Sequence, residues 1–258
     1  MTDRQENGWS TYDHYAYAAV AVIGTLIAVG ILYWVVAASP FAGWLRGLGP
    51  VTGPFLNVVG VLFGLTLAFL SNDTWTAHDR ARSAILREAD AVRGLHILAS
   101  GLTGAEGAGL QRAIRDYVAA SAGEWPALAQ CTTDPAARKA ADRLLALAAA
   151  PGIPAALGAV VQQRMLAEIT TIRENRDTRI GLSRTHVNPL KWLAMAFLGF
   201  LTLVSIAVVH IDSPSAALTS MVLFGLAAAP TAAIVLIHGN PFQPPSAVKP
   251  TLILEALD

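Results

Sequence analysis

Four long uncharged stretches constrain this 258-residue chain more than any other feature of its sequence. A helix needs about 20 largely apolar residues to cross the hydrocarbon core of a bilayer. The stretches that meet or approach this length without a charged side chain are residues 17–38, 51–70, 192–210 and 215–238. Backbone polar groups inside lipid must bond to one another, so such stretches form helices. The sequence therefore predicts four transmembrane helices.

The composition agrees with a membrane protein and excludes several other classes. Hydrophobic residues make up 54% of the chain and charged residues 14%, whereas average soluble domains carry about 25% charged residues. The formal net charge is zero, so no overall field points to a nucleic-acid partner. Cys131 is the only cysteine and the six histidines are scattered, so we expect no intrachain disulfide, no metal site and no cofactor.

The distribution of positive charge predicts the orientation, because cytoplasmic flanks retain Lys and Arg. Only Arg4, Arg46 and Lys249 of the 18 basic residues lie outside residues 72–191. The central segment is therefore expected to face the cytoplasm. An even number of spans places both termini on the same side, and the two short outer loops carry Arg46 and Asp212.

The spacing of the spans predicts the domain organisation. The links between spans one and two and between spans three and four are too short to hold domains, so each pair is expected to form a helical hairpin. The predicted parts are the N-terminus 1–16, hairpin 17–71, central segment 72–191, hairpin 192–238 and tail 239–258. No run alternates as a strand would. The predicted fold class is an all-α membrane protein with a helical cytoplasmic domain between spans two and three.

The central segment carries the signals of several helices. Residues 74–100 are amphipathic, with apolar side chains at helical spacing, and are expected to continue the second span. Thr103 and Glu106 have the spacing of a capping box. Asp134 followed by Pro135 predicts another helix start, and a long helix is expected from about 155 to 182. Such short, Ala-rich segments bury modest cores, which favours an oligomer.

The second span carries a stripe of small and polar residues along one face. Its members recur every three or four positions and are Gly53, Asn57, Gly60, Gly64, Ala68 and Ser71. The stripe is explained either by close helix packing or by a face toward an aqueous pore; an amide within the bilayer needs a partner or water. The opposite face carries Phe55, Leu62, Phe63 and Phe69. These residues face lipid or narrow a pore as a hydrophobic gate.

Basic residues gather before the third span, at Arg173, Arg176, Arg179 and Arg184. They are either a solvated, salt-bridged helix face that also anchors to anionic lipids, or a basic approach that draws anions to a pore mouth. We find no phosphate-binding glycine loop, nucleophile elbow or HExxH motif. The sequence therefore predicts no catalytic residues and no enzyme.

Five short motifs are spread along the chain. They are AFLSNDTW at the end of the second span, READAVRGLH with Glu88, RDYVAASAGEWP with Tyr117, Glu124, Trp125 and Pro126, RENRDTRI with Arg176 and Arg179, and GNPF with Pro241 and Phe242. These motifs resemble the bestrophin-like membrane proteins of bacteria and plants. Together with the layout of the spans, the resemblance covers nearly the whole chain.

The resemblance implies a four-span protomer of a homo-oligomer, such as a pentamer, that conducts chloride or other inorganic anions along its axis. The second span from Gly53 to Ser71 then becomes the expected pore wall. The implied partners are the lipid bilayer, further copies of the chain and inorganic anions, and the implied location is a bacterial inner (plasma) membrane. The acidic calcium cluster of animal bestrophins has no counterpart here. The alternative is a non-conducting membrane scaffold or regulatory protein whose helical domain binds a partner.

Overall fold

The computed structural model describes residues 14–40, 42–184 and 189–257, which form two compact helical units. The first, called the membrane unit, extends to Trp75 and resumes from Val187 to Gly239. The second, called the helical unit, comprises Thr76–His186 and the segment from Asn240 onward. Every regular element among the described residues is a helix, in agreement with the predicted class. Residues 1–13 of the predicted N-terminal part and residues 185–188 before the third span lie outside the described residues.

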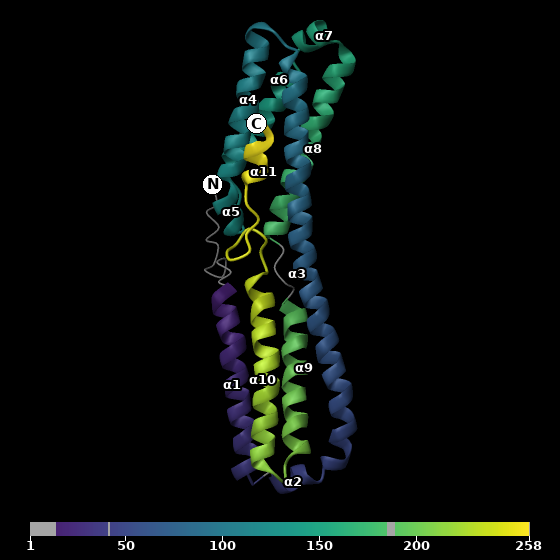
Figure 1. Cartoon of the computed structure of the whole chain (residues 1–258), viewed down its shortest axis with the longest axis vertical. Coiled ribbons are helices and arrows are strands. Elements are labelled where there is room, and N and C mark those ends of the chain that lie inside the picture. Colours follow the sequence, from purple (N-terminus) through teal and green to yellow (C-terminus); the bar gives the residue numbers. More distant parts are fainter. Residues whose placement is uncertain (1–13, 41, 185–188, 258) are drawn as a thin grey trace, which may run out of the picture. The chain divides into compact units, whose positions relative to one another are not determined.

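The membrane unit contains the four predicted spans. Its helices are α1 (His14–Ala38), the short α2 (Ala42–Arg46), the first part of α3 (Gly49–Ser100), α9 (Pro189–Val209) and α10 (Pro214–Ile237), as Figure 1 shows. By length and composition, α1, α3, α9 and α10 are apolar enough to cross a membrane. They coincide with the four uncharged stretches.

Packing in the membrane unit does not follow the order of the chain. Helices α1, α9 and α10 contact one another, and α1 packs chiefly against α10. Small side chains allow this approach: a Cβ added at Gly225 of α10 would touch Thr25 of α1 at 3.4 Å. Helix α3 joins through Phe63 and Leu70, which share a buried cluster with α9 and α10. The first two spans are consecutive in the chain, but α1 packs chiefly against α10 and not against α3.

Helix α3 is one unbroken helix of 52 residues, far more than the roughly 20 that cross a bilayer. The predicted continuation of the second span into the amphipathic segment is therefore confirmed. Ile85, Ala89, Val92 and Leu95 of that segment are all buried in the core of the helical unit. The spacing that predicted their common face thus describes the packing face.

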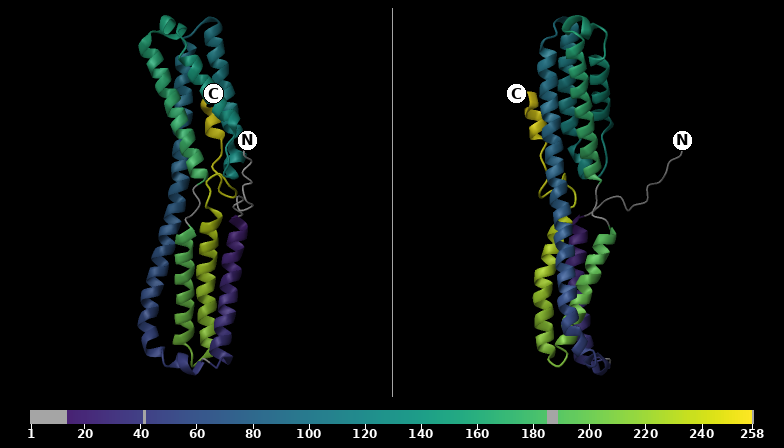
Figure 2. Two further views of the ribbon diagram at one scale, coloured as in Figure 1. Left: turned by 180° about the vertical axis from the view of Figure 1, so that it is seen from behind. Right: turned by 90° about the vertical axis from the view of Figure 1, so that its right-hand side faces the viewer.

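The helical unit is a bundle around the second part of α3. Its other helices are α4 (Gly104–Gly123), α5 (Trp125–Ala129), α6 (Pro135–Ala148), α7 (Gly152–Leu157), α8 (Ala159–Ser183), α11 (Thr251–Leu254) and a 3₁₀ turn (Glu255–Leu257). Figure 2 shows α4, α6 and α8 running beside α3 in two further views. Leu110, Ile114, Leu144, Met165 and Ile169 fill the core between them.

Three predicted helix signals have different outcomes. The Asp134 carboxylate caps α6 by accepting from the Ala136 N–H at 2.8 Å, as predicted. Thr103 precedes α4 but makes no side-chain cap hydrogen bond, and Glu106 lies against Gly152 instead, so the capping box does not form. The helix expected from 155 is interrupted at Gly158, whose φ of +85° only glycine adopts readily, and α8 begins one residue later.

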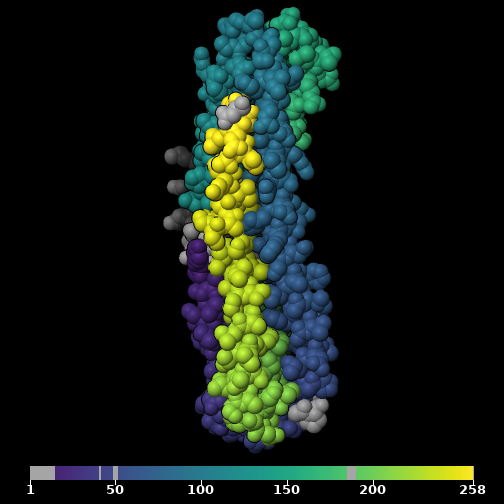
Figure 3. All heavy atoms as spheres, in the orientation of Figure 1, coloured from purple at the N-terminus to yellow at the C-terminus, as the bar shows by residue number. Residues whose placement is uncertain are grey.

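The segment from Asn240 to Leu257 runs along the outside of the helical unit, drawn in yellow in Figure 3. Phe242, Ile253 and Ala256 enter the same core as α3 and α4. The Asn240 amide donates to the Leu128 carbonyl at 3.1 Å, and the Trp125 indole donates to the Val248 carbonyl at 2.6 Å. This segment therefore completes the helical unit.

Candidate functional site

The small and polar stripe of α3 is left uncovered by the part of the protomer that the structure describes. A Cβ added at Gly53, Gly60 or Gly64 would meet nothing within 4 Å. Ala68 is exposed, and the Ser71 hydroxyl donates back to the Leu67 carbonyl of its own helix at 2.9 Å. Within one protomer, these glycines therefore do not bring two helices together. Whatever covers the stripe is water, lipid or another chain.

Asn57 lies in the middle of this stripe and its side chain is exposed. Among the described residues its amide has no hydrogen-bond partner. An amide carries two donors and one acceptor group, and leaving such a group unpaired in an apolar medium costs roughly 2–7 kcal/mol. Lipid contact is thus the least favourable of the three environments for this position.

The four bulky residues of α3 divide into two groups. Phe55, Leu62 and Phe69 are 45%, 46% and 68% exposed. Phe63 is buried; its ring packs on Phe224 of α10 with centroids 5.3 Å apart and lies against Gly199 of α9. Phe63 therefore belongs to the core of the membrane unit, and a gate role rests on the other three side chains.

At 3.6 residues per turn, the face with Asn57, Gly60 and Gly64 lies nearly opposite the face with Phe55, Leu62 and Phe69. Both faces are exposed, and the buried side of α3 with Val59 and Leu70 lies between them. One straight helix cannot turn both exposed faces toward the same axis. The predicted pore wall and the predicted gate are therefore alternatives for that surface.

The helical unit holds a buried charged network, which we define as Glu88, Tyr117, Ser121, Glu124, Arg176 and Arg179. Helix α3 supplies Glu88, α4 supplies Tyr117 and Ser121, and α8 supplies both arginines; Glu124 lies at the turn between α4 and α5. Three distant segments of the chain thus meet at one point. The side chains of Glu88, Glu124 and Arg179 are fully buried.

Each arginine in this network is held by a carboxylate. Arg179 donates to both oxygens of Glu88, from Nε at 2.7 Å and from Nη2 at 2.9 Å, and Nη2 also donates to the Ser121 hydroxyl at 2.8 Å. Arg176 binds both oxygens of Glu124, with Nε at 3.0 Å. Such two-point contacts are the strong form of the arginine–carboxylate pair. The network is therefore electrically balanced inside the unit.

Aromatic side chains close the network. The Arg179 guanidinium lies over the Trp125 ring, 4.7 Å from its centroid, and Phe242 meets Trp125 edge-on at 5.8 Å. The Tyr117 hydroxyl donates to Glu88 at 2.7 Å. Four of the five motifs that carry the family resemblance supply residues to this site; AFLSNDTW does not. Sequence reasoning misses this pairing, because no local signal links Glu88 to an arginine 91 positions away.

The four arginines predicted to form a basic approach to the pore divide into a buried pair and an exposed pair. Arg176 and Arg179 are buried and neutralised, so they hold the fold together. Arg173 is exposed and lies 3.6 Å from Asp142, and Arg184 is exposed near the end of α8. Arg173 and Arg184 are the two of the four whose side chains are exposed. Among the described residues, no three His, Cys, Asp or Glu side chains are grouped to hold a metal.

Titration of Tyr117 provides a test of the network at high pH. Burial, reinforced by the charge of Glu88, raises the pKa of Tyr117 well above its ordinary value of 10.0. A folded-state pKa above the unfolded-state value means that folding favours the protonated tyrosine. The contribution of Tyr117 to the free energy of unfolding is therefore intact below about pH 10 and is lost as the pH rises toward the folded-state pKa. We expect the free energy of unfolding to fall above about pH 10.

The matched variant is Tyr117→Phe, which removes the titrating group and one hydrogen bond worth about 1 kcal/mol. Its unfolding free energy, followed by circular dichroism in detergent over a pH series, should start lower at neutral pH and decline less steeply in alkali than that of the unaltered chain. If the unfolding free energies of the two proteins fall in parallel with pH, Tyr117 does not contribute to the loss of stability in alkali.

Comparisons with known proteins bear on the whole chain. A family model described as a bestrophin-like domain matches residues 23–253. A solved crystal structure, described as that of a membrane protein, superimposes with a TM-score of 0.69 at 13% identity, covering 94% of this chain and 98% of the other. No curated protein matches the sequence. The structural likeness supports the fold, and the family model covers both the stripe and the charged network.

Proposed function

The chain belongs to the bestrophin-like family, and on that premise we propose that it is the protomer of an oligomeric anion channel whose pore is lined by the membrane part of α3. The family and the four apolar helices identify a channel-type integral membrane protein. The pore wall, the chloride-type ion and the oligomer are our proposal. The enzyme class has no support from the family.

The observation that carries the proposal is Asn57 on an uncovered stripe. The amide has no partner among the described residues of the protomer, and the neighbouring Gly60 and Gly64 leave open space beside it. Water in an axial pore satisfies the amide at every subunit, because symmetry repeats the position around the axis. We therefore assign the stripe to the pore, and Phe55, Leu62 and Phe69 to lipid or to subunit contacts.

The proposed pore has no buried charge in its wall, so it conducts passively. No residue of α3 between Gly53 and Asn72 is charged, and an ion crosses such a neck by keeping part of its water while positive potential lowers the remaining dehydration cost. Of the four arginines before the third span, the exposed Arg173 and Arg184 supply this positive potential. We propose that they lie on the cytoplasmic side, together with both termini, in an inner membrane.

A second candidate is a non-conducting scaffold, and the uncovered glycines favour it as well. Small residues on one face of a membrane helix also allow another helix to pack closely. In a scaffold, the stripe of one protomer is covered by a span of its neighbour, and the Asn57 amide bonds across that interface. The two candidates agree on assembly and differ in whether a continuous aqueous path exists.

Conductance of the purified protein tests the proposal. The protein is reconstituted into planar bilayers, and current is recorded under a chloride gradient, then with chloride replaced by a large impermeant anion on one side. We expect current whose reversal potential follows the anion gradient and not the cation gradient. Bilayers that contain the assembled oligomer and pass no current under any anion gradient would exclude a channel and leave the scaffold.

A further inference from the structure

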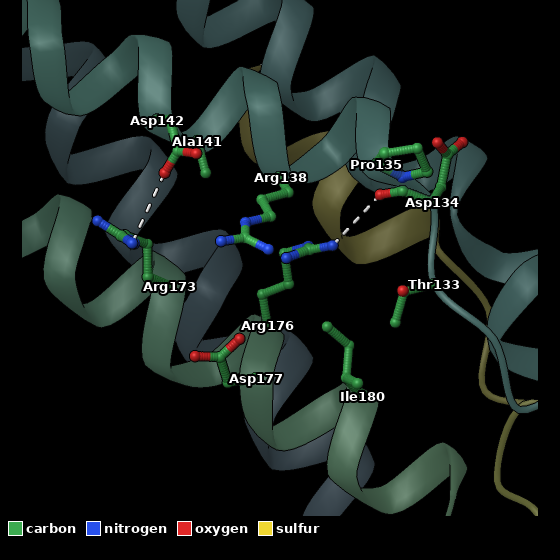
Figure 4. Close-up of a pocket in the computed structure, with 10 residues that line it drawn as sticks. All are labelled: Thr133, Asp134, Pro135, Arg138, Ala141, Asp142, Arg173, Arg176, Asp177 and Ile180. Carbon is green, nitrogen blue, oxygen red and sulfur yellow. Dashed lines mark hydrogen bonds and ion pairs between the residues drawn. The ribbon is translucent and has the colours of Figure 1, made fainter. Parts of the chain in front are cut away.

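A polar pocket in the helical unit belongs neither to the stripe nor to the core of the buried network. Its volume is about 350 Å³, and it lies between the start of α6 and the second half of α8. Arg138 of α6 and Arg173 and Arg176 of α8 line it, and Figure 4 shows the guanidinium groups of Arg138 and Arg176 directed toward each other. Arg173 and Arg176 have acidic partners, whereas Arg138 has none among the described residues.

The lining carries three arginines and three aspartates, Asp134, Asp142 and Asp177, but not all of these side chains are paired. Arg173 has Asp142 at 3.6 Å. Arg176 uses Nε and Nη2 on Glu124, and no hydrogen bond of its Nη1 exists among the described residues. In the same part of the chain Arg138 has no ion pair or hydrogen bond at all. Donors from two arginines thus face the pocket unused.

The start of α6 adds positive potential at the same place. A helix N-terminus carries a partial positive charge, and cations there are unfavourable. Arg138 lies in the first turn of α6, which contains no acidic side chain, and the Asp134 carboxylate is engaged by the Ala136 N–H. An oxyanion placed between Arg138 and Arg176 would relieve both unfavourable interactions.

One acidic side chain limits what the anion can be. Asp177 also lines the pocket, and among the described residues its carboxylate has no partner. It would repel a simple dianion but would accept a hydrogen bond from a hydroxyl or ammonium group. The pocket therefore presents unused cationic donors and an unused acceptor within a space large enough for a small molecule.

We propose that this pocket binds a small ligand through a phosphate or carboxylate group held between Arg138 and Arg176, with a hydroxyl or ammonium group of the same ligand directed at Asp177. Guanidinium groups suit this role because their planar donors match both oxyanions at two points. The site is independent of whether α3 lines a pore, since it uses only residues of the helical unit.

Calorimetric titration of the full chain in neutral detergent with O-phosphoserine tests the site. We expect saturable binding that Arg138→Ala weakens by about tenfold or more, because a charge-assisted hydrogen bond is lost. The matched control is Lys139→Ala: Lys139 is the next residue of α6, equally cationic and exposed, but it does not line the pocket. Its affinity should stay within about twofold of the unaltered chain, since it makes no direct contact.

The acceptor is tested with two probes. Asp177→Asn should weaken O-phosphoserine and should not weaken inorganic phosphate, which has no ammonium group. The proposal is overturned if neither probe binds saturably, or if Arg138→Ala and Lys139→Ala reduce affinity equally, because that would be nonspecific attraction.

A phosphate group can also come from a lipid headgroup, and native mass spectrometry separates the two sources. The protein is released from nanodiscs that contain phosphatidylglycerol, and retained lipid is counted for the unaltered chain and for Arg138→Ala. Equal retention assigns the site to a soluble ligand. Loss of one lipid per protomer in Arg138→Ala assigns it to a headgroup. The soluble ligand is accepted only if O-phosphoserine also binds saturably in the titration above.

Discussion

Glu88→Leu is expected to destabilise the helical unit by about 3–5 kcal/mol, because it leaves the buried Arg179 cation without its carboxylate. Arginine cannot escape by losing a proton. The nearest remaining carboxylate oxygen belongs to Glu124 at 3.9 Å, and Glu124 is already bound to Arg176. Since typical domains are stable by only about 5–15 kcal/mol, this change removes a large part of the total.

The double variant Glu88→Leu/Arg179→Met tests whether the loss of stability comes from the unpaired charge of Arg179. Removing both charges leaves no unpaired buried ion at this position, so we expect it to recover at least half of the loss, although Tyr117 and Ser121 lose their partner. Unfolding free energies of the single and double variants, measured in detergent by circular dichroism, give the coupling between the two residues.

A neighbouring exposed pair supplies the control. Asp90 lies two residues after Glu88 on α3 and pairs with Arg93 at 3.3 Å, with both side chains exposed. Exposed pairs contribute about 0–1 kcal/mol, so Asp90→Asn should have little effect. If Glu88→Leu costs no more than Asp90→Asn, the network does not hold the helical unit together.

Asn57→Leu is expected to lower single-channel conductance by about tenfold or more while leaving the oligomer intact. Loss of about 1.4 kcal/mol of stabilisation at the narrowest point slows passage about tenfold, and the symmetric oligomer carries the change in every subunit. The measurement is single-channel current in bilayers beside oligomer mass by light scattering. Val58→Leu, an apolar substitution at the next exposed position, is the control.

Gly64→Leu separates the pore from the scaffold. Within the described ranges of its own chain, a Cβ added at this position meets no atom within 4 Å, so we expect the fold of one chain to tolerate the change. If the stripe lines a pore, current falls and the oligomer persists. If the stripe packs between subunits, the oligomer dissociates, and conduction, where it existed, disappears only with it. If Asn57→Leu and Gly64→Leu both conduct normally, the small and polar stripe of α3 does not line the pore.

The sequence is sufficient to predict where the helices lie in the chain, but not which helices pack against one another. Hydropathy located four spans within a few residues, and the 3.6-residue period of Ile85, Ala89, Val92 and Leu95 extended the second span correctly. The packing of α1 on α10 was not foreseen, since hydropathy says nothing about which apolar faces meet. The break at Gly158 was missed because a glycine at one helix start has no distinctive local pattern.

The charged network shows the same limit at the level of single residues. Arg176 and Arg179 were read as surface charge, because charged side chains are seldom buried unless they are paired. Their carboxylates lie 52 and 91 residues away, so the pairing exists only after α3, α4 and α8 have come together. The place of Asn57 among apolar neighbours, by contrast, is visible in the sequence. Only the structure shows that its amide has no partner among the described residues.

The segment from Asn240 to Leu257 has a consequence for biosynthesis. Its Phe242, Ile253 and Ala256 complete a core that otherwise consists of residues between 81 and 172, and α9 and α10 separate the two in the chain. Domains fold as units while the ribosome is still adding residues. Here the core of the helical unit stays incomplete during synthesis. It lacks Phe242, Ile253 and Ala256 until α9, α10 and the segment from Asn240 to Leu257 have been synthesised.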